Sequence, residues 1–185
     1  KNKIEKFERV HMRDLWQKYA GVNLDDYLAR EKMLALCEQK GYRPAKDEAY
    51  EDLFHRIFLN EIEPKLKGGQ IIHHYPASMA ALARLSDEDS RYAERFEVYI
   101  NGLEIANAFS ELTDAEEQLR RLKAEKNLRE HLGKTVYDID MEFIAAVGGL
   151  PPSAGIALGV DRLAQVLTGC QNIDDVITLP MSKMF

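Results

Sequence analysis

A glycine-rich segment, GIALGVDRL, occupies residues 155–163 and runs from a strand-like pattern into the first turn of a helix. Because glycine has no side chain, the backbone at Gly155 and Gly159 can approach a ligand closely. Arg162 follows in the helix, and a guanidinium can stack on a base and hold phosphate oxygens with paired donors. The pattern is suited to ATP. A tightly packed strand-to-helix corner with a surface arginine would give the same pattern.

Acidic and amide side chains lie in a second segment near the middle of the chain, at Glu104, Asn107 and Glu111. Strict strand alternation places Glu104 on one face of a sheet and the other two on the opposite face. A shared site therefore requires a β-bulge or twist between Ala106 and Ser110, or a strand that ends before Glu111. As an alternative, these acids would be solvated residues of an edge strand.

The strands that must hold these residues form a hairpin pattern. The segments RFEVYI and LEIANAF are separated by Asn101 and Gly102. A type I′ turn needs positive φ at both central positions, which Asn-Gly tolerates best. We therefore expect two antiparallel strands. The glycine-rich strand AGIALGV should lie beside them, so that Gly159 and Arg162 approach Glu104.

Helical patterns precede this hairpin. Residues 1–22 pattern as a short helix, a second helical stretch closes at Gly41, and QIIHHYP at residues 70–76 reads as a strand. From Asp47 to Leu66, apolar residues recur at spacings of three and four, which predicts an amphipathic helix. Its apolar face consists of Tyr50, Leu53, Phe54, Ile57, Phe58 and Ile62.

Further helices follow the hairpin. Thr113, with Glu116 three residues later, predicts a capping box at the start of a long charged helix, and Gly133 predicts its end. DIDMEFIAAV predicts a shorter helix. The glycine-rich strand then leads into a last helix, DRLAQVLTG.

Composition indicates one soluble globular domain, since 45% of the 185 residues are hydrophobic and 30% are charged. No stretch reaches the roughly 18 apolar residues needed to span a bilayer, and the first residues lack the apolar core of a signal peptide. We therefore expect a cytoplasmic protein with no membrane association. The net charge of −6 argues against a nonspecific nucleic-acid surface.

Cysteine and histidine patterns do not predict a metal site. Cys37 and Cys170 lie far apart without a CxxC motif, so neither zinc nor a disulfide framework is expected. His73 and His74 are adjacent in a predicted strand, which should point them to opposite faces. No third ligand accompanies them.

Together, these segments resemble a known family. GIALGVDRL resembles motif 3 of class II aminoacyl-tRNA synthetases, and RFEVYINGLEIANAFSELTDAEEQ resembles the strand pair that carries the metal, ATP and lysine ligands of lysyl-tRNA synthetases. HHYPASMAALARLS is more similar to the related lysine ligases of elongation factor P, as is Ala157, where lysyl-tRNA synthetases usually have glycine. At Ala108 the chain departs from a family glycine, which removes the easiest bulge. The resemblance extends from about Leu53 to Pro180.

The resemblance implies a role for each candidate residue. Glu104 would bind ATP through Mg²⁺, because a hard cation offsets the charge of the phosphates. Arg162 would be the catalytic residue, and Glu111 would face the substrate or a second Mg²⁺. The implied ATP-binding residues are Glu104, Ile105, Asn107, Gly159 and Arg162. The implied substrate-binding residues are Glu111, Gly155 and Ala157, and the implied metal ligands are Glu104 and Glu111.

The resemblance also implies an α+β fold with a class II synthetase-type antiparallel sheet flanked by helices. Residues 1–185 would form the C-terminal part of one catalytic domain, beginning just after motif 2. Motif 1, which forms the dimer interface, and motif 2, which supplies an arginine for the α-phosphate, are not found in this sequence. We therefore expect a partial domain that is inactive alone, from a parent enzyme that is a homodimer.

The implied reaction is ATP-dependent activation of lysine or β-lysine as an aminoacyl-adenylate, followed by transfer to a lysine of elongation factor P. A lysyl-tRNA synthetase that charges tRNA is the alternative enzyme. An OB-fold of roughly 100 residues encoded upstream would point to tRNA. A noncatalytic synthetase-like regulatory subunit is an alternative of another class, which Glu104, Glu111 and Arg162 argue against.

Overall fold

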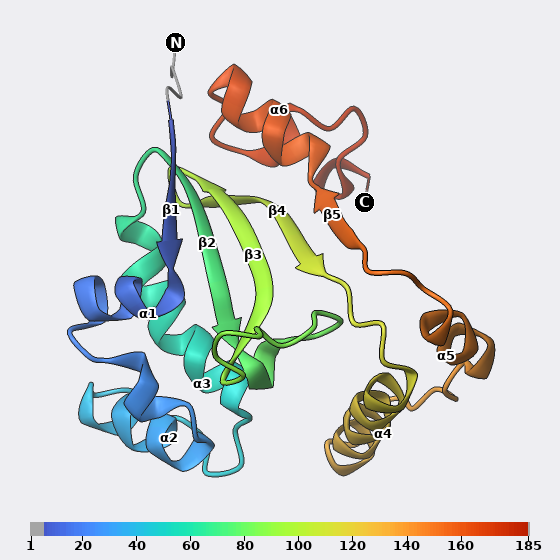
Figure 1. Cartoon of the computed structure of the whole chain (residues 1–185). Helices are drawn as coiled ribbons and strands as arrows, with labels where there is room; N and C mark the ends of the chain where they lie inside the picture. Colours follow the sequence, from blue (N-terminus) through green and yellow to red (C-terminus); the bar gives the residue numbers. More distant parts are fainter. Residues whose placement is uncertain (1–5, 185) are drawn as a thin grey trace.

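A central five-stranded sheet organises the computed structural model, which describes residues 6–184. The strands lie in the order β1-β2-β3-β4-β5, so neighbours in the sequence are neighbours in the sheet. Figure 1 shows α1 to α3 on one side of the sheet, with α6 at one end of β4 and α4 and α5 toward the other. The strands are β1 Phe7–His11, β2 Gly69–Pro76, β3 Tyr92–Ile100, β4 Leu103–Ser110 and β5 Ala154–Leu158.

Helices of very different lengths complete the α+β fold. The α-helices are α1 Met12–Leu15, α2 Arg30–Gln39, α3 Tyr50–Ile57, α4 Ala115–His131, α5 Met141–Gly148 and α6 Val160–Thr168. Two of them continue as π-helical turns, at Trp16–Ala20 and Phe58–Ile62. No helix within residues 6–184 combines the length and apolarity needed to cross a membrane.

The predicted hairpin is confirmed. Strands β3 and β4 pair antiparallel, with Ile100 opposite Leu103. The two turn residues have positive φ, 52° at Asn101 and 82° at Gly102. This is the conformation that a type I′ turn requires. Strand β5 pairs antiparallel with β4, as expected for the glycine-rich strand.

The first strand corrects two expectations. Residues 7–11 form β1 rather than part of a helix, and β1 pairs with β2 in parallel, Phe7 opposite Gly69. The sheet is therefore mixed and not wholly antiparallel. A five-residue strand with charged residues has no distinctive local pattern, and its pairing partner lies more than 60 positions away in the sequence. Residues 1–5 of the predicted helix lie outside the described part of the chain.

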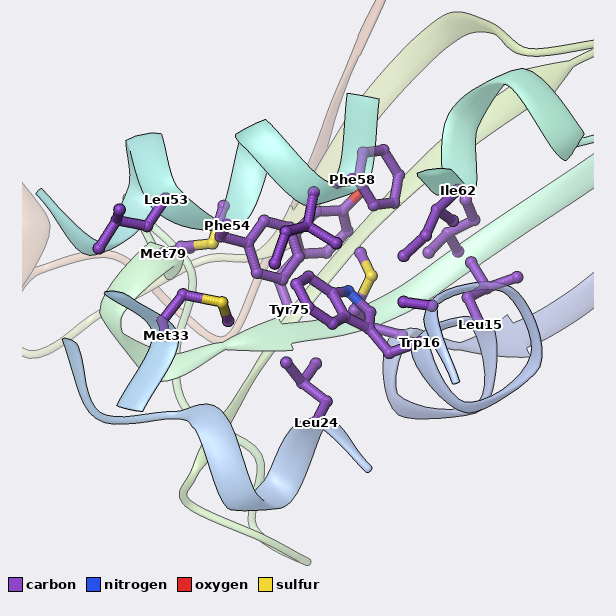
Figure 2. Close-up of a cluster of buried hydrophobic side chains, with 14 of the residues drawn as sticks. Leu15, Trp16, Leu24, Met33, Leu53, Phe54, Phe58, Ile62, Tyr75 and Met79 are labelled. Carbon is purple, nitrogen blue, oxygen red and sulfur yellow. The ribbon is translucent and has the colours of Figure 1, made fainter. Parts of the chain in front are cut away.

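The hydrophobic core fills the space between α1 to α3 and one face of the sheet, as Figure 2 shows. All six residues of the predicted apolar face of α3 and its π-helical turn are buried. At the centre, the Trp16 ring lies 4.8 Å from that of Phe54, which is stacked 5.8 Å from Phe58. Tyr75 and Tyr99 reach this core from β2 and β3. The core thus fixes which sheet face the helices cover.

The start of α4 differs from the predicted capping box by one residue. Asp114, not Thr113, is the N-cap, and its carboxylate accepts hydrogen bonds from the backbone N–H groups of Glu116 at 2.9 Å and Glu117 at 3.0 Å. An aspartate is as good an acceptor at this position as a threonine, so the local pattern is ambiguous. The predicted end is confirmed, since Gly133 has φ of 64° just after the helix.

The two adjacent histidines do not point to opposite faces. A register shift between His73 and Tyr75 places a β-bulge in β2, where His74 has φ of 62°. Their Nδ1 atoms lie 2.6 Å apart, and the His11 ring is stacked on His74 with centroids 4.8 Å apart. The bulge interrupts the alternation of side chains along β2, and the prediction of opposite faces for the two histidines depended on that alternation.

This histidine cluster makes the stability of the fold dependent on pH. Burial, followed by the charges of His74, Arg13 and His73, lowers the pKa of His11 to about 4. Burial and the charge of His74 also lower the pKa of His73. The unfolded chain therefore binds protons more readily than the fold between about pH 6.5 and pH 4, so stability is complete above pH 6.5 and falls as the pH decreases toward 4.

We expect the free energy of unfolding at pH 5 to be lower than at pH 7.5, by roughly 1 kcal/mol from His11 once solvent screening is allowed for, with His73 acting in the same direction. Urea titrations followed by the fluorescence of Trp16, which is fully buried, measure this difference. The substitution His11→Asn retains a capping side chain for the N–H of Arg13 but cannot titrate. It should reduce the pH dependence. An unchanged difference between the two pH values would contradict the prediction.

Candidate functional site

A β-bulge in β4 brings the predicted site residues onto one face. Val98 pairs with Ala106, but the next residue of β3, Tyr99, pairs with Glu104, which leaves Ile105 as the extra residue. The bulge resets the alternation, so that Glu104 and Asn107 share a face. We expected a bulge or twist between Ala106 and Ser110, or a strand that ends before Glu111; the bulge lies before Ala106, and β4 does end at Ser110.

Strand β5 adds two more predicted residues to this face. Asn107 lies opposite Ala157, and Phe109 lies opposite Gly155. A Cβ atom built on Gly155 would lie 2.3 Å from Oε1 of Glu111. The Glu111 carboxylate therefore sits over Gly155, on the same face as Asn107. A side chain at Gly155 would therefore displace this carboxylate, a constraint that the sequence did not suggest.

The ATP-binding candidates meet at the end of β4 nearer to α6. Nη1 of Arg162 donates to the backbone oxygen of Glu104 at 3.0 Å and lies 3.3 Å from its carboxylate Oε2. The N–H of Gly159 donates to the carbonyl of Ile105 at 2.8 Å. The expected approach of Gly159 and Arg162 to Glu104 is thus confirmed as geometry. A cavity of about 390 Å³ there is lined by Glu104, Ile105, Asn107, Ala157, Gly159 and Arg162, among others.

Gly159 differs from Gly155 in what surrounds it. Its φ is −76°, which any residue adopts, and an added Cβ would meet only the carbonyl of Ile105 at 3.5 Å and the side chain of Arg162 at 3.6 Å. The chain itself therefore tolerates a side chain at Gly159. Packing within residues 6–184 therefore does not require glycine at this position.

Glu104 and Glu111 occupy opposite ends of the face. They are seven positions apart, along β4 and the residue that follows it, or about 20 Å at the usual rise per residue. One ion cannot bind both carboxylates at this separation. The two carboxylates would therefore bind different groups. Glu104 lies near Arg162, and Glu111 lies near Gly155.

The sequence interpretation missed a buried carboxylate in the middle of this face. Glu97 lies opposite Asn107 and is 6% exposed. It accepts hydrogen bonds from Tyr75 Oη at 2.5 Å, Tyr99 Oη at 2.8 Å and Arg95 Nη2 at 2.6 Å. Alternation within RFEVYI, which puts Arg95, Glu97 and Tyr99 on one face, was the signal that could have found it.

Arg95 is itself held in place. Its Nη1 donates to the carbonyl of Met79 at 2.8 Å, and its guanidinium lies 4.5 Å from the centroid of the Tyr75 ring. Burial, together with the negative charge of Glu97, raises the pKa of both Tyr75 and Tyr99. Both hydroxyls therefore stay protonated and donate to Glu97, which fixes the orientation of this carboxylate.

A third acidic residue near this site, Glu63, comes from the segment that precedes β2. Glu63 lies in a short 3-10 turn, Glu63–Lys65, after the π-helical turn. Burial raises the pKa of Glu63, the charges of Glu104 and Glu97 raise it further, and Arg162 lowers it. Sequence reasoning gave no hint of Glu63, because its proximity depends on how the helical layer docks on the sheet.

The residues present fit a nucleotide bound with a divalent cation. Mg²⁺ is usually held by one or two carboxylates together with phosphate oxygens, and Glu104 supplies such a carboxylate at the cavity. Arg162 supplies a charge-assisted donor for a phosphate. The amide Oδ1 of Asn107 is buried, and no group within residues 6–184 hydrogen-bonds to it. An unpaired buried amide between these groups is what a bound ligand would satisfy.

The fold and this site define the class to which the chain belongs. The model of the family described as tRNA synthetases class II (D, K and N) matches residues 2–183. The chain is therefore a member of the class II tRNA synthetase family.

Several individual proteins similar to this chain are named as ligases. A protein of Histophilus somni (strain 2336) named elongation factor P--(R)-beta-lysine ligase is 45% identical over 137 residues, which cover 72% of this chain and 42% of the relative. Proteins with the same name from Avibacterium paragallinarum and Haemophilus ducreyi (strain 35000HP / ATCC 700724) are 38% and 37% identical. Each matches 97% of this chain, and the chain covers 56% and 55% of them. The chain thus spans about half the length of these relatives.

Loss of the cation beside the buried carboxylate should be costly. The substitution Arg95→Met leaves Glu97 without its ion pair, and breaking a buried pair typically costs about 3 to 5 kcal/mol of unfolding free energy. Arg84→Met is the matched control, because Arg84 pairs with Glu94 at 2.7 Å but is 46% exposed. Its loss should cost at most about 1 kcal/mol. Urea unfolding compares the two variants, and equal losses would show that the buried network is not special.

Proposed function

We propose that this chain provides part of the active site of an ATP-dependent ligase that activates lysine or β-lysine and transfers it to a lysine of elongation factor P. The observation that carries the proposal is the cavity where β4, β5 and α6 meet, with Glu104, Asn107, Gly159 and Arg162 at its wall. The names of the relatives support the choice of substrate and acceptor. We also infer that residues 1–185 form the C-terminal part of one catalytic domain.

Bound ATP with Mg²⁺ would supply the adenylyl group and offset the charge of the phosphates. The carboxylate of the amino acid attacks the α-phosphorus, pyrophosphate leaves, and an aminoacyl-adenylate remains. Such a transfer needs positioning and charge neutralisation rather than a covalent nucleophile. In this chain Arg162 would bind phosphate oxygens, Glu104 would hold the cation, and Asn107 would hydrogen-bond the ligand.

The other end of the face would bind the amino acid. Glu111 over Gly155 presents a carboxylate that can hold an ammonium group of lysine or β-lysine. Ala157 lies between this carboxylate and the nucleotide end, opposite Asn107. The order along the face is therefore cation and phosphate, then the reacting carboxylate, then the ammonium group.

The acceptor distinguishes this proposal from its nearest alternative. Transfer to elongation factor P would add the mass of one lysine or β-lysine to that protein, whereas a lysyl-tRNA synthetase would label tRNA. We propose elongation factor P because the relatives compared above are named as its ligases. We further propose that the enzyme acts in the cytoplasm as a homodimer.

The reaction can be tested by ATP-pyrophosphate exchange with lysine and with β-lysine, using the longest reading frame that contains this chain. We expect exchange that depends on the amino acid, and a loss of about 100-fold to 1000-fold in Arg162→Ala, because removing one preorganised donor typically has that effect. Arg43→Ala is the control, since Arg43 is an exposed residue between α2 and α3. Exchange that is unaffected by Arg162→Ala would reject the proposed phosphate site.

The choice between isomers can be tested at Ala157. The methyl group of Ala157 fills space on the face that the α-amino group of lysine would use, whereas an amine on the β-carbon avoids the contact. Such overpacking costs about 1 to 3 kcal/mol, or roughly tenfold to 100-fold in discrimination. We therefore expect a preference for β-lysine, and Ala157→Gly should shift the ratio of kcat/KM toward α-lysine. An unchanged ratio would mean that Ala157 only packs β5 against α6.

A further inference from the structure

The carboxylate of Glu111 lies beyond the last residue of β4, so its placement depends on contacts outside that strand. On one side, the N–H of Glu111 donates to the carbonyl of Ser153 at 2.9 Å, just before β5. On the other side, Glu111 pairs with Ala83 as an isolated antiparallel bridge. Glu111 is therefore held between two connecting segments.

The segment that carries Ala83 has little regular structure of its own. It follows a three-residue 3-10 turn, and Ala81 within it has φ of 50°, a conformation that is costly for a residue with a Cβ atom. Two backbone hydrogen bonds tie it to the end of β4, from Leu112 N–H to Leu82 O and from Arg84 N–H to Ser110 O, each 2.9 Å. Something outside the segment must hold it in this conformation.

Arg121 of α4 provides that hold. Its Nη1 donates to the carbonyl of Ala81 at 3.0 Å and to the carbonyl of Ala83 at 2.8 Å. Its Nε donates to Glu117 at 2.7 Å, one helical turn earlier, and its side chain is only 17% exposed. Hydrogen bonds from Arg120 and Arg121 lower the pKa of Glu117 to about 2, so this carboxylate remains charged and keeps the guanidinium oriented.

These contacts connect the start of α4 back to the end of β4. Helix α4 is capped by Asp114, three residues after Glu111, and within two turns it presents Arg121. Arg121 holds the carbonyl of Ala83, and Ala83 pairs with Glu111. A shift of Arg121 would therefore be transmitted to Glu111 through the backbone bonds that join this segment to the end of β4.

We propose that Arg121 is a positioning residue that sets the carboxylate of Glu111 for the ammonium group of the substrate, by clamping Ala81 and Ala83 against the end of β4. The proposal rests on the proposed function of Glu111 as a substrate-binding residue. It assigns no substrate contact to Arg121, which acts only through the bridged segment. Gly155 contributes the other half of the placement, because it leaves room for the carboxylate.

The test compares Arg121→Met with Arg120→Met in the longest reading frame that contains this chain. Arg120 pairs with the same Glu117 at 2.6 Å but is 71% exposed, so its substitution removes a similar charge without loosening the segment. In pyrophosphate exchange, Arg121→Met should raise KM for the amino acid about tenfold or more, since small misplacement of a binding group has large effects. KM for ATP should stay within twofold, and Arg120→Met should match the wild type.

A double-mutant cycle with Glu111→Gln separates positioning from general damage. If Arg121 acts through Glu111, Arg121→Met should add little further loss to Glu111→Gln. Independent, multiplying losses, or an equal rise in both KM values, would overturn the proposal. If Arg121→Met fails to fold, Arg121→Lys replaces it, because lysine keeps the charge but cannot bond two carbonyls and Glu117 in the fork geometry of arginine.

Amide hydrogen exchange tests the contacts of Arg121 without relying on the proposed function. The amides of Arg84 and Leu112 donate the two bonds that join the segment to β4. They should exchange at least about tenfold faster in Arg121→Met than in Arg120→Met. Unchanged exchange at these amides overturns the clamp itself. If wild-type protein lacks lysine-dependent and β-lysine-dependent exchange of pyrophosphate while the amides respond as expected, the proposed function fails and the clamp stands.

Discussion

The buried carboxylate of Glu97 is the constraint on which the arrangement of the site depends. A charge that is almost fully removed from water must be paired and hydrogen-bonded, and here two tyrosine hydroxyls and one guanidinium do this. Tyr75 comes from β2, while Tyr99 and Arg95 come from β3. The carboxylate therefore fixes the register of two strands relative to each other. It also marks the middle of the face that carries the other site residues.

The same network joins the site to the hydrophobic core. Tyr75 and Tyr99 have their rings in the core beneath α1 to α3 and their hydroxyls on Glu97. This is the usual arrangement of a buried tyrosine, with an apolar body and a polar tip. Packing of the helical layer thus positions the polar face, and the docked layer also brings Glu63 toward Glu104.

The face is divided into two ends with different chemistry. Near α6, an arginine and an acid lie together around a cavity, which suits phosphates and a cation. Near α4, a single carboxylate lies over a glycine and is held by backbone bridges, which suits an ammonium group. Strand β4 and the residue that follows it keep the two ends about 20 Å apart, so one elongated ligand or two adjacent ligands can span them.

Local signals made much of the site predictable. The Asn-Gly turn, the glycine-rich strand and Arg162 at the start of a helix each have a meaning that depends on neighbouring residues alone. The order of these segments was enough to place Arg162 beside Glu104, because strands that are close in sequence usually pair. Elsewhere, the prediction was wrong where an element depends on contacts between residues that are distant in the sequence. Strand β1 exists because β2 pairs with it, and no pattern within residues 7–11 announces that partner.

By itself, the sequence determined the hairpin, the apolar face of α3, the family resemblance and the identity of the ATP-site candidates, since these depend on short-range periodicity and turn chemistry. The tertiary structure decided where alternation breaks. The bulges at Ile105 and His74 reverse which side chains share a face, and a bulge depends on the pairing between strands rather than on either strand alone. It also decided the positions of Glu97, Glu63 and Arg121. Each of these has at least one neighbour distant in sequence, whose approach only the packed fold determines.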